Sequence, residues 1–104
     1  MEIRFFDVAI ERFILKLEKP TIAKVLRIID LLERFGPSLG MPQSKSIGRL
    51  LFELRIHGSQ EVRLIYAFHE RGAVILHGFV KKSRKLPEED LQIALKRKKA
   101  LDNI

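Results

Sequence analysis

The stretch from residue 49 to residue 80 constrains the fold most, because it reads as three consecutive strands joined by short turns. Apolar runs cover residues 49–57, 61–69 and 73–80, and Gly58 and Gly72 mark the turns between them. Short runs rich in β-branched and aromatic residues, bounded by glycine, are typical of β-hairpins. The pattern therefore predicts an antiparallel meander of three strands.

Side-chain alternation assigns the two faces of this meander. Successive side chains of a strand point to opposite faces. Arg55 and Arg63 fall on the face that we expect to be open. The face that we expect to be the core, covered by helices, carries Leu50, Phe52, Leu54 and Ile56 from the first strand and Val62, Leu64, Tyr66 and Phe68 from the second.

The turn at residues 58–60 predicts the pairing of the first two strands. It sets His57 opposite Glu61 and Arg55 opposite Arg63, whereas a slip by one residue would mix the two faces. Like charges directly opposite each other are destabilising unless an anion lies between them, and the planar fork of arginine matches phosphate. Glu53 offers the alternative, a surface Glu–Arg network without a ligand.

The third strand has no clear core face, because both alternating sets are mostly apolar. A central strand covered on both faces gives this pattern. If Val74, Leu76 and Val80 face the helices, His77 and Phe79 join the arginine face. Phe79 could then stack on a nucleotide base, and His77 could transfer protons or contact phosphate. The alternative for His77 is a packing or hydrogen-bonding role.

The remaining segments complete an α+β fold of one domain, residues 1–104. Asp7 is suited to cap the first helix, because a carboxylate there accepts unpaired backbone N–H groups. The sheet is expected to be antiparallel, with an N-terminal strand added to the three-strand meander, two N-terminal helices packed on it, and a C-terminal helix. In order, we predict a strand at 2–7, helices at 8–19 and 20–35, a connecting loop at 36–48, and a last helix beginning at Pro87.

Composition narrows the classes of partner. The formal net charge is +7, from 20 Lys and Arg against 13 Asp and Glu, which favours nucleic acid, an acidic protein or an anionic surface. The sequence has no cysteine, which excludes disulfides and thiolate-bound metals. No signal peptide or membrane span is evident, so we expect a cytoplasmic protein. No metal or cofactor motif is evident, and we expect neither.

A basic cluster follows the third strand, at residues 81–85. It combines Lys81, Lys82, Arg84 and Lys85 beside the predicted arginine face. Such a cluster can hold a polyanion through its phosphates, which supplies affinity rather than sequence choice. The alternative is a solvated loop.

The segments LFELRI, VRLIYAF and ILHGFVKKSRKLP, followed by an acidic-to-basic helix, resemble the RelE/HigB superfamily of toxins. The phage-derived HigB-like branch of type II toxin–antitoxin systems is the most similar. The resemblance implies a RelE-like microbial ribonuclease fold and metal-independent cleavage of mRNA in the ribosomal A site. It also implies a helix-turn-helix antitoxin as partner. Operator DNA would be contacted only through that antitoxin, and no membrane partner is expected.

The resemblance also implies roles for particular residues. Arg63 matches a phosphate-stabilising arginine, with Arg55 as a second cation, and Lys81 and Lys82 match catalytic or RNA-contacting positions. RelE enzymes carry a tyrosine near the C-terminus, whereas Tyr66 here is expected in the core. The proton-transfer group is therefore His77 or a lysine, and RNA contacts are expected from Lys85, Arg84, Phe79 and His57. The alternative is a catalytically inactive relative that binds nucleic acid or antitoxin.

Overall fold

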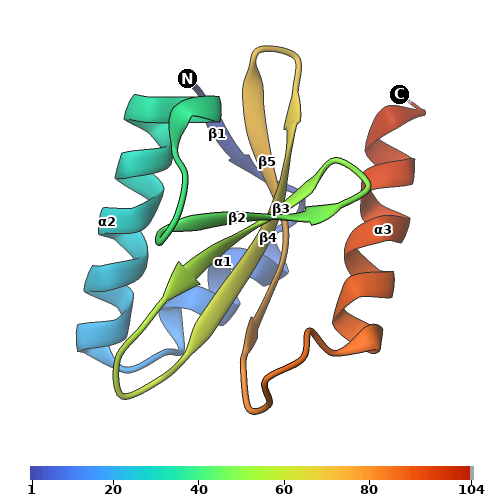
Figure 1. Ribbon diagram of the computed structural model, residues 1–104. Helices are drawn as coiled ribbons and strands as arrows, with labels where there is room; N and C mark the ends of the chain where they lie inside the picture. Colours follow the sequence, from blue (N-terminus) through green and yellow to red (C-terminus); the bar gives the residue numbers. More distant parts are fainter. Residues whose placement is uncertain (104) are drawn as a thin grey trace.

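The computed structural model describes residues 1–103 as an α+β protein built on one five-stranded sheet (Figure 1). The order across the sheet is β1-β5-β4-β3-β2. The strands are β1 (Ile3–Phe5), β2 (Ser44–Gly48), β3 (Leu51–Ile56), β4 (Val62–His69) and β5 (Gly72–Val80). The helices are α1 (Val8–Leu15), α2 (Lys19–Phe35), the short 3-10 helix η1 (Gly36–Ser38) and α3 (Glu88–Asp102).

The predicted meander and its register are confirmed. β3 pairs with β4, and β4 with β5, both antiparallel, and Arg55 lies directly opposite Arg63. The predicted helix cap is also present, since the Asp7 carboxylate accepts a hydrogen bond of 3.2 Å from the backbone N–H of Ile10. The first helix ends at Leu15, earlier than the predicted Lys19.

The sheet is mixed, so the prediction of an antiparallel sheet was wrong. β1 pairs with β5 in parallel, with Ile3 opposite Ala73. A strand this short carries no sequence signal for direction. Its direction is set by its pairing with β5, which lies far away in the sequence.

The predicted loop at 36–48 contains an edge strand, which the sequence reading missed. β2 pairs antiparallel with β3, with Lys45 opposite Glu53. Its sequence, SKSIG, is short and polar, and most of its residues are exposed. Polar, lysine-bearing edge strands resist pairing with other chains, and this removes the apolar alternation by which a strand is recognised.

Helices cover both faces of the sheet. In Figure 1, α1 and α2 lie to one side of the sheet and α3 to the other. One core, which includes Leu54, Leu64 and Tyr66, packs against α1 and α2 as predicted. A second core joins the α3 residues Ala94 and Leu101 to the sheet. The arginine face is therefore not open along its length, because α3 covers the half that lies away from the arginines.

A β-bulge in β5 settles the orientation that alternation left undecided. Ile65 pairs with His77, but the next residue of β4, Tyr66, pairs with Ile75, so Leu76 has no partner. One extra residue in a strand shifts the faces of all residues beyond it. Val74 and Leu76 therefore face α3, and beyond the bulge His77 and Phe79 also lie on the arginine face.

Gly78 of β5 packs closely against Phe13 of α1 and Leu64 of β4. A Cβ atom there would be 2.8 Å from Leu64 Cδ2 and 2.9 Å from Phe13 Cδ2. Any larger residue would require the Phe13 or Leu64 side chain to shift. This contact explains why the HGF sequence of β5 holds a glycine at its centre.

Two hairpins turn through residues with unfavourable backbone angles. Arg49 and Leu50 join β2 to β3 with φ of 55° and 61°, and Glu70 and Arg71 join β4 to β5 with φ of 48° and 65°. Two-residue hairpin turns need positive φ at both positions, where asparagine and glycine are preferred. Leu50, predicted in the core, is instead 74% exposed at a turn, because the strand begins one residue later.

No helix within residues 1–103 has both the length and the apolar character needed to span a membrane.

The turn at Leu50 predicts a stabilising substitution. Left-handed backbone costs a non-glycine residue about 1–2 kcal/mol, and glycine avoids this strain. The greater entropy that glycine loses on folding cancels about 0.5–1 kcal/mol of that gain. We therefore expect Leu50→Gly to raise the free energy of unfolding by about 1 kcal/mol, measured by urea denaturation. The matched control is Leu26→Gly at an exposed position within α2, which should lower the stability by about 1 kcal/mol. Loss of stability in both variants would contradict the strained turn.

Candidate anion-binding site

The paired arginines form the floor of the candidate site. The Arg63 side chain is only 4% exposed, and its Nη1 donates to the Val62 carbonyl at 3.0 Å and to Glu61 Oε2 at 3.4 Å. Within residues 1–103, the Nε atoms of both Arg55 and Arg63 are buried without a hydrogen-bond partner. Buried, unpaired donors are costly, so an acceptor that reached either Nε would stabilise the protein.

The alternative Glu–Arg network is present in part. Glu53 is buried beside Arg55, but its Oε1 lies 3.8 Å from Arg55 Nε, too far for a hydrogen bond. Glu61 contacts Arg63 only through Nη1. These carboxylates offset part of the arginine charge and leave both Nε donors unsatisfied.

The arginines open into a hollow of about 510 Å³. A backbone hydrogen bond of 2.6 Å from Lys81 N to the Glu61 carbonyl ties the basic cluster to the start of β4. The hollow brings together five of the cations singled out from the sequence and a single carboxylate. Its charged lining residues are Arg55, Arg63, Lys81, Lys82 and Arg84, with Glu61.

Glu61 and His57 form a hydrogen-bonded pair at the rim of this hollow. Glu61 Oε2 lies 2.7 Å from His57 Nδ1. Burial by itself would raise the pKa of Glu61, but the hydrogen bond and charge of His57, together with Arg63, lower the pKa below its ordinary value. The carboxylate is therefore ionised at neutral pH, so Nδ1 donates to it and Nε2 stays available to carry or accept a proton.

Sequence reasoning missed Glu61 as a site residue, although it predicted the hairpin that produces the pair. The turn at 58–60 brings His57 and Glu61 to the two ends of adjoining strands. A histidine and a glutamate that face each other across a predicted turn were the available signal.

His77 and Phe79 share the arginine face but do not line the hollow. His77 Nε2 lies 2.6 Å from Asp90 Oδ1 in the first turn of α3. Its ring stacks on Phe79 at 5.9 Å between centroids, and Phe79 is only 8% exposed within the α3 core. Both rings thus help to hold α3 against the sheet.

Lys85, another residue predicted to contact RNA, does not line the hollow either.

Tyr66 takes no part in the hollow. It is buried in the core, as its place in β4 predicts, and its hydroxyl lies 2.6 Å from Ser44 Oγ in β2. Burial raises the pKa of Tyr66, which the Ser44 hydrogen bond offsets in part. Tyr66 therefore anchors the edge strand rather than serving a site.

Residues 1–103 hold no group of three or more His, Cys, Asp and Glu side chains arranged as a metal site. The donors that converge on the hollow are guanidinium and ammonium groups, which bind oxyanions rather than cations. The fold and the hollow together define a small α+β protein with a cationic hollow at one end of its sheet.

The comparison with protein families gives this site a context. Residues 12–99 match the family described as "Phage derived protein Gp49-like (DUF891)", and the chain belongs to this family. The Gp49-like family is grouped with the RelE/HigB-like toxins of toxin–antitoxin systems, which agrees with the resemblance seen in the sequence. No curated protein matches the chain.

The hollow predicts stabilisation by inorganic phosphate. A ligand at ten times its dissociation constant stabilises a native protein by about 1.4 kcal/mol. We expect phosphate to raise the melting temperature above that in sodium chloride of equal ionic strength, and Arg55→Gln to abolish most of this difference. The control is Arg4→Gln, since Arg4 lies in β1 and pairs with Glu2. An equal response of both variants would contradict the assignment.

Proposed function

We propose that this protein is the toxin of a type II toxin–antitoxin system and an endoribonuclease that cleaves mRNA on the ribosome without a metal ion. The observation that carries the proposal is the pair of buried, unsatisfied arginine Nε donors beneath a hollow rich in further cations. Its family supports the same reading, because the RelE-like toxins with which it is associated are ribonucleases. The proposal includes membership of the HigB-like branch and cleavage of the message in the ribosomal A site.

The proposed reaction is a transesterification within the RNA. The ribose 2′-oxygen forms a bond to the adjacent phosphorus, and the bond from phosphorus to the 5′-oxygen breaks. The products are a 2′,3′-cyclic phosphate and a free 5′-hydroxyl. Negative charge builds on the phosphate oxygens during the step, so fixed donors at those oxygens lower the barrier.

Arg55 and Arg63 suit the stabilising role. Both are held in the sheet before any substrate arrives, so little reorganisation is needed at the moment of reaction. The guanidinium forks offer donors at two neighbouring positions of the hollow floor. This arrangement would bind the phosphorane more tightly than the starting diester, because the phosphorane carries more charge.

The proton transfers fall to groups at the rim. We assign the 2′-hydroxyl proton to His57 Nε2, with Glu61 orienting the ring and stabilising the imidazolium that forms. Lys82 supplies the proton to the departing 5′-oxygen. We choose His57 rather than His77 because the His77 ring is hydrogen bonded to Asp90 and stacked on Phe79.

The cellular partners follow from the same proposal. A cognate helix-turn-helix antitoxin would neutralise the protein, and mRNA on the ribosome would be its substrate.

Induced expression in bacteria tests the function. We expect growth arrest and cuts in translated messages, detected by primer extension, and Lys82→Ala and Arg63→Ala should relieve both. Loss of one transition-state donor costs about 10²–10³ in rate. Lys82 is exposed, so Lys82→Ala keeps the test informative if Arg63→Ala fails to fold.

Lys45→Ala is the matched control, an exposed lysine of β2 outside the hollow, and it should stay toxic. Unchanged cutting in Lys82→Ala and a folded Arg63 variant would overturn the mechanism. Arrest with intact messages would overturn the nuclease function.

The choice of His57 over His77 has its own test. His57→Asn should lower the cleavage rate about 10²–10⁴-fold and remove a limb of the pH–rate profile, as expected for loss of a general base. His77→Asn should instead weaken the hold on α3 and lower the melting temperature, with the pH–rate profile of the folded protein unchanged. The opposite assignment holds if His77→Asn alters the profile and His57→Asn does not.

A further inference from the structure

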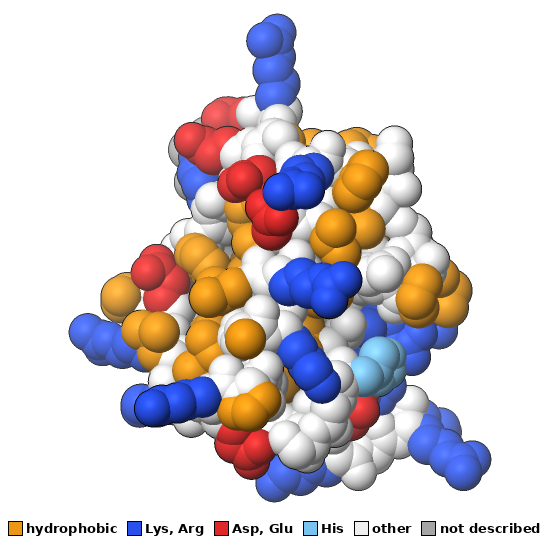
Figure 2. All heavy atoms as spheres, turned by 90° about the vertical axis from the view of Figure 1, so that its left-hand side faces the viewer, with side chains coloured by type: hydrophobic (Ala, Val, Ile, Leu, Met, Phe, Trp, Pro, Cys, Tyr) orange, Lys and Arg blue, Asp and Glu red, His pale blue; other side chains and the backbone are white. Residues whose placement is uncertain are grey.

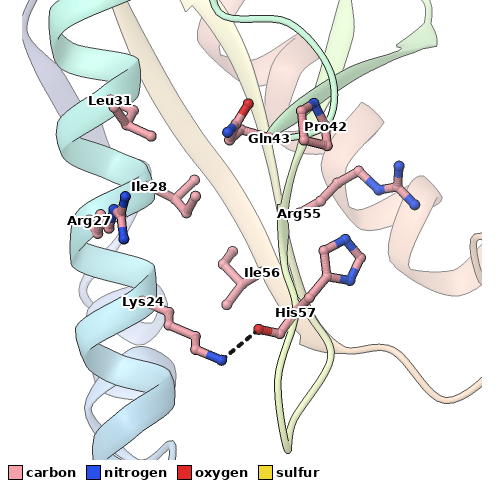
Figure 3. A pocket seen from close by; sticks show the side chains of 9 residues that line it. All are labelled: Lys24, Arg27, Ile28, Leu31, Pro42, Gln43, Arg55, Ile56 and His57. Atoms are coloured by element: carbon pink, nitrogen blue, oxygen red, sulfur yellow. Dashed lines mark hydrogen bonds between the residues drawn. The ribbon is translucent and has the colours of Figure 1, made fainter.

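A second recess adjoins the hollow, in the groove between α2 and β3. It has a volume of about 270 Å³ (Figure 3). The residues that line it are Lys24, Arg27, Ile28 and Leu31 from α2, Arg55 and Ile56 from β3, His57 just after β3, and Pro42 and Gln43 just before β2. We call it the α2–β3 groove. Of the residues that line the groove, only Arg55 and His57 had a functional role predicted from the sequence.

The groove and the hollow share a wall. Arg55 lines both of them, and Figure 3 shows its guanidinium pointing away from α2, so that its aliphatic stem faces the groove. His57 lines the groove and is hydrogen bonded to Glu61, which lines the hollow. A chain that leaves the hollow over Arg55 therefore enters the groove directly.

The groove carries charge of one sign. Its ionisable lining residues are Lys24, Arg27, Arg55 and His57, with no carboxylate among them. Lys24 Nζ donates to the His57 carbonyl at 2.9 Å, which fixes one ammonium at the groove end nearest the turn. Figure 2 shows this side of the molecule, where Lys and Arg side chains stand among apolar ones. The occupant is expected to be anionic and partly apolar.

The apolar part of the groove lies on the α2 wall. Ile28 and Leu31 form a surface on which a flat ring can rest. Phe35 continues the same helix face one turn further and is 55% exposed. A nucleotide has this combination of an apolar ring face and an anionic phosphate, and RNA-binding sites commonly hold unstacked bases against such side chains.

Phe79, the base-stacking residue predicted from the sequence, does not line the hollow. Phe79, the aromatic residue on the arginine face, is buried beneath α3 and stacked on His77. A strand held at the scissile phosphate must nevertheless place its flanking nucleotides somewhere. The groove is cationic, has room for a small ligand in its volume of about 270 Å³, and shares Arg55 with the hollow.

We propose that the α2–β3 groove is a binding site for the nucleotide next to the scissile phosphate, with Lys24 and Arg27 on its phosphate and Ile28 and Leu31 against its base. This proposal rests on the proposed ribonuclease function and adds the path of the RNA strand across β3 to α2. It replaces Phe79 with the wall of α2 as the base-binding surface.

Binding of a non-cleavable RNA tests the groove. The whole 104-residue chain is titrated, by fluorescence anisotropy, with a labelled single-stranded RNA pentanucleotide that carries one 2′-deoxy position in place of the attacking hydroxyl. Lys24→Gln/Arg27→Gln should weaken binding about tenfold or more, and should lower the salt dependence of log K by about 1.4, as expected for two lost contacts to single-stranded phosphates.

The control double variant is Lys19→Gln/Arg34→Gln. It removes the same charge from α2 at exposed residues outside the groove, where Arg34 pairs with Asp30 at 3.2 Å. Its affinity should match that of the wild type. An equal loss of RNA affinity in both double variants would show that only net charge matters, and would overturn the proposed binding site.

Cross-linking locates the base directly. Pentanucleotides with 4-thiouridine on one side or the other of the deoxy position are irradiated, and one of them should cross-link to a peptide from α2. Cross-links confined to α3 or β5 would overturn the proposal. So would a wild-type chain that binds no RNA, or an acidic amphipathic peptide that binds the groove when RNA does not.

Failure of the groove is distinguishable from failure of the ribonuclease. If the groove variants bind RNA normally while Lys82→Ala abolishes message cutting, the function stands and the strand follows another path. If messages remain intact in the cell, the nuclease fails regardless of the groove.

Discussion

The pairing of β3 with β4 is the constraint on which the rest of the structure depends. It sets Arg55 opposite Arg63 on the part of the sheet that α3 leaves uncovered, while α1 and α2 cover the opposite face. Two like charges at such a position oppose each other, and the nearby carboxylates Glu53 and Glu61 offset them without satisfying both Nε atoms. The protein accepts this cost because the core faces of both strands cannot be buried in any neighbouring register.

The other elements of the site are arranged around that pair. Because of the bulge at Leu76, Val74 and Leu76 in the first part of β5 pack in the α3 core. The end of β5 still pairs with β4, so the basic cluster that follows it starts beside β4. The Lys81 backbone bond to Glu61 holds the cluster there. α3 then closes one half of the arginine face, and α2 leaves a groove beside the other half. The cationic hollow is thus confined to one end of the sheet.

Burial decides which of the candidate residues are available for chemistry. His57, just beyond the end of β3, and His77, within β5, are both paired with a carboxylate, at 2.7 Å and 2.6 Å. The partner of His57 lines the hollow, whereas the partner of His77 is the N-terminal turn of α3. The same chemical pair therefore serves the proposed site in one case and the attachment of a helix in the other.

Alternation and turn length in the sequence determined the meander, its register, the Arg55–Arg63 pair and the burial of Tyr66. These depend on local backbone geometry, which a short segment specifies by itself. The direction of β1, the polar edge strand β2, the bulge at Leu76 and the cover provided by α3 were decided only by tertiary packing. Each depends on which surfaces meet across the sheet. The turn in the sequence predicted that Glu61 faces His57, but only the folded chain placed Glu61 in the lining of the hollow.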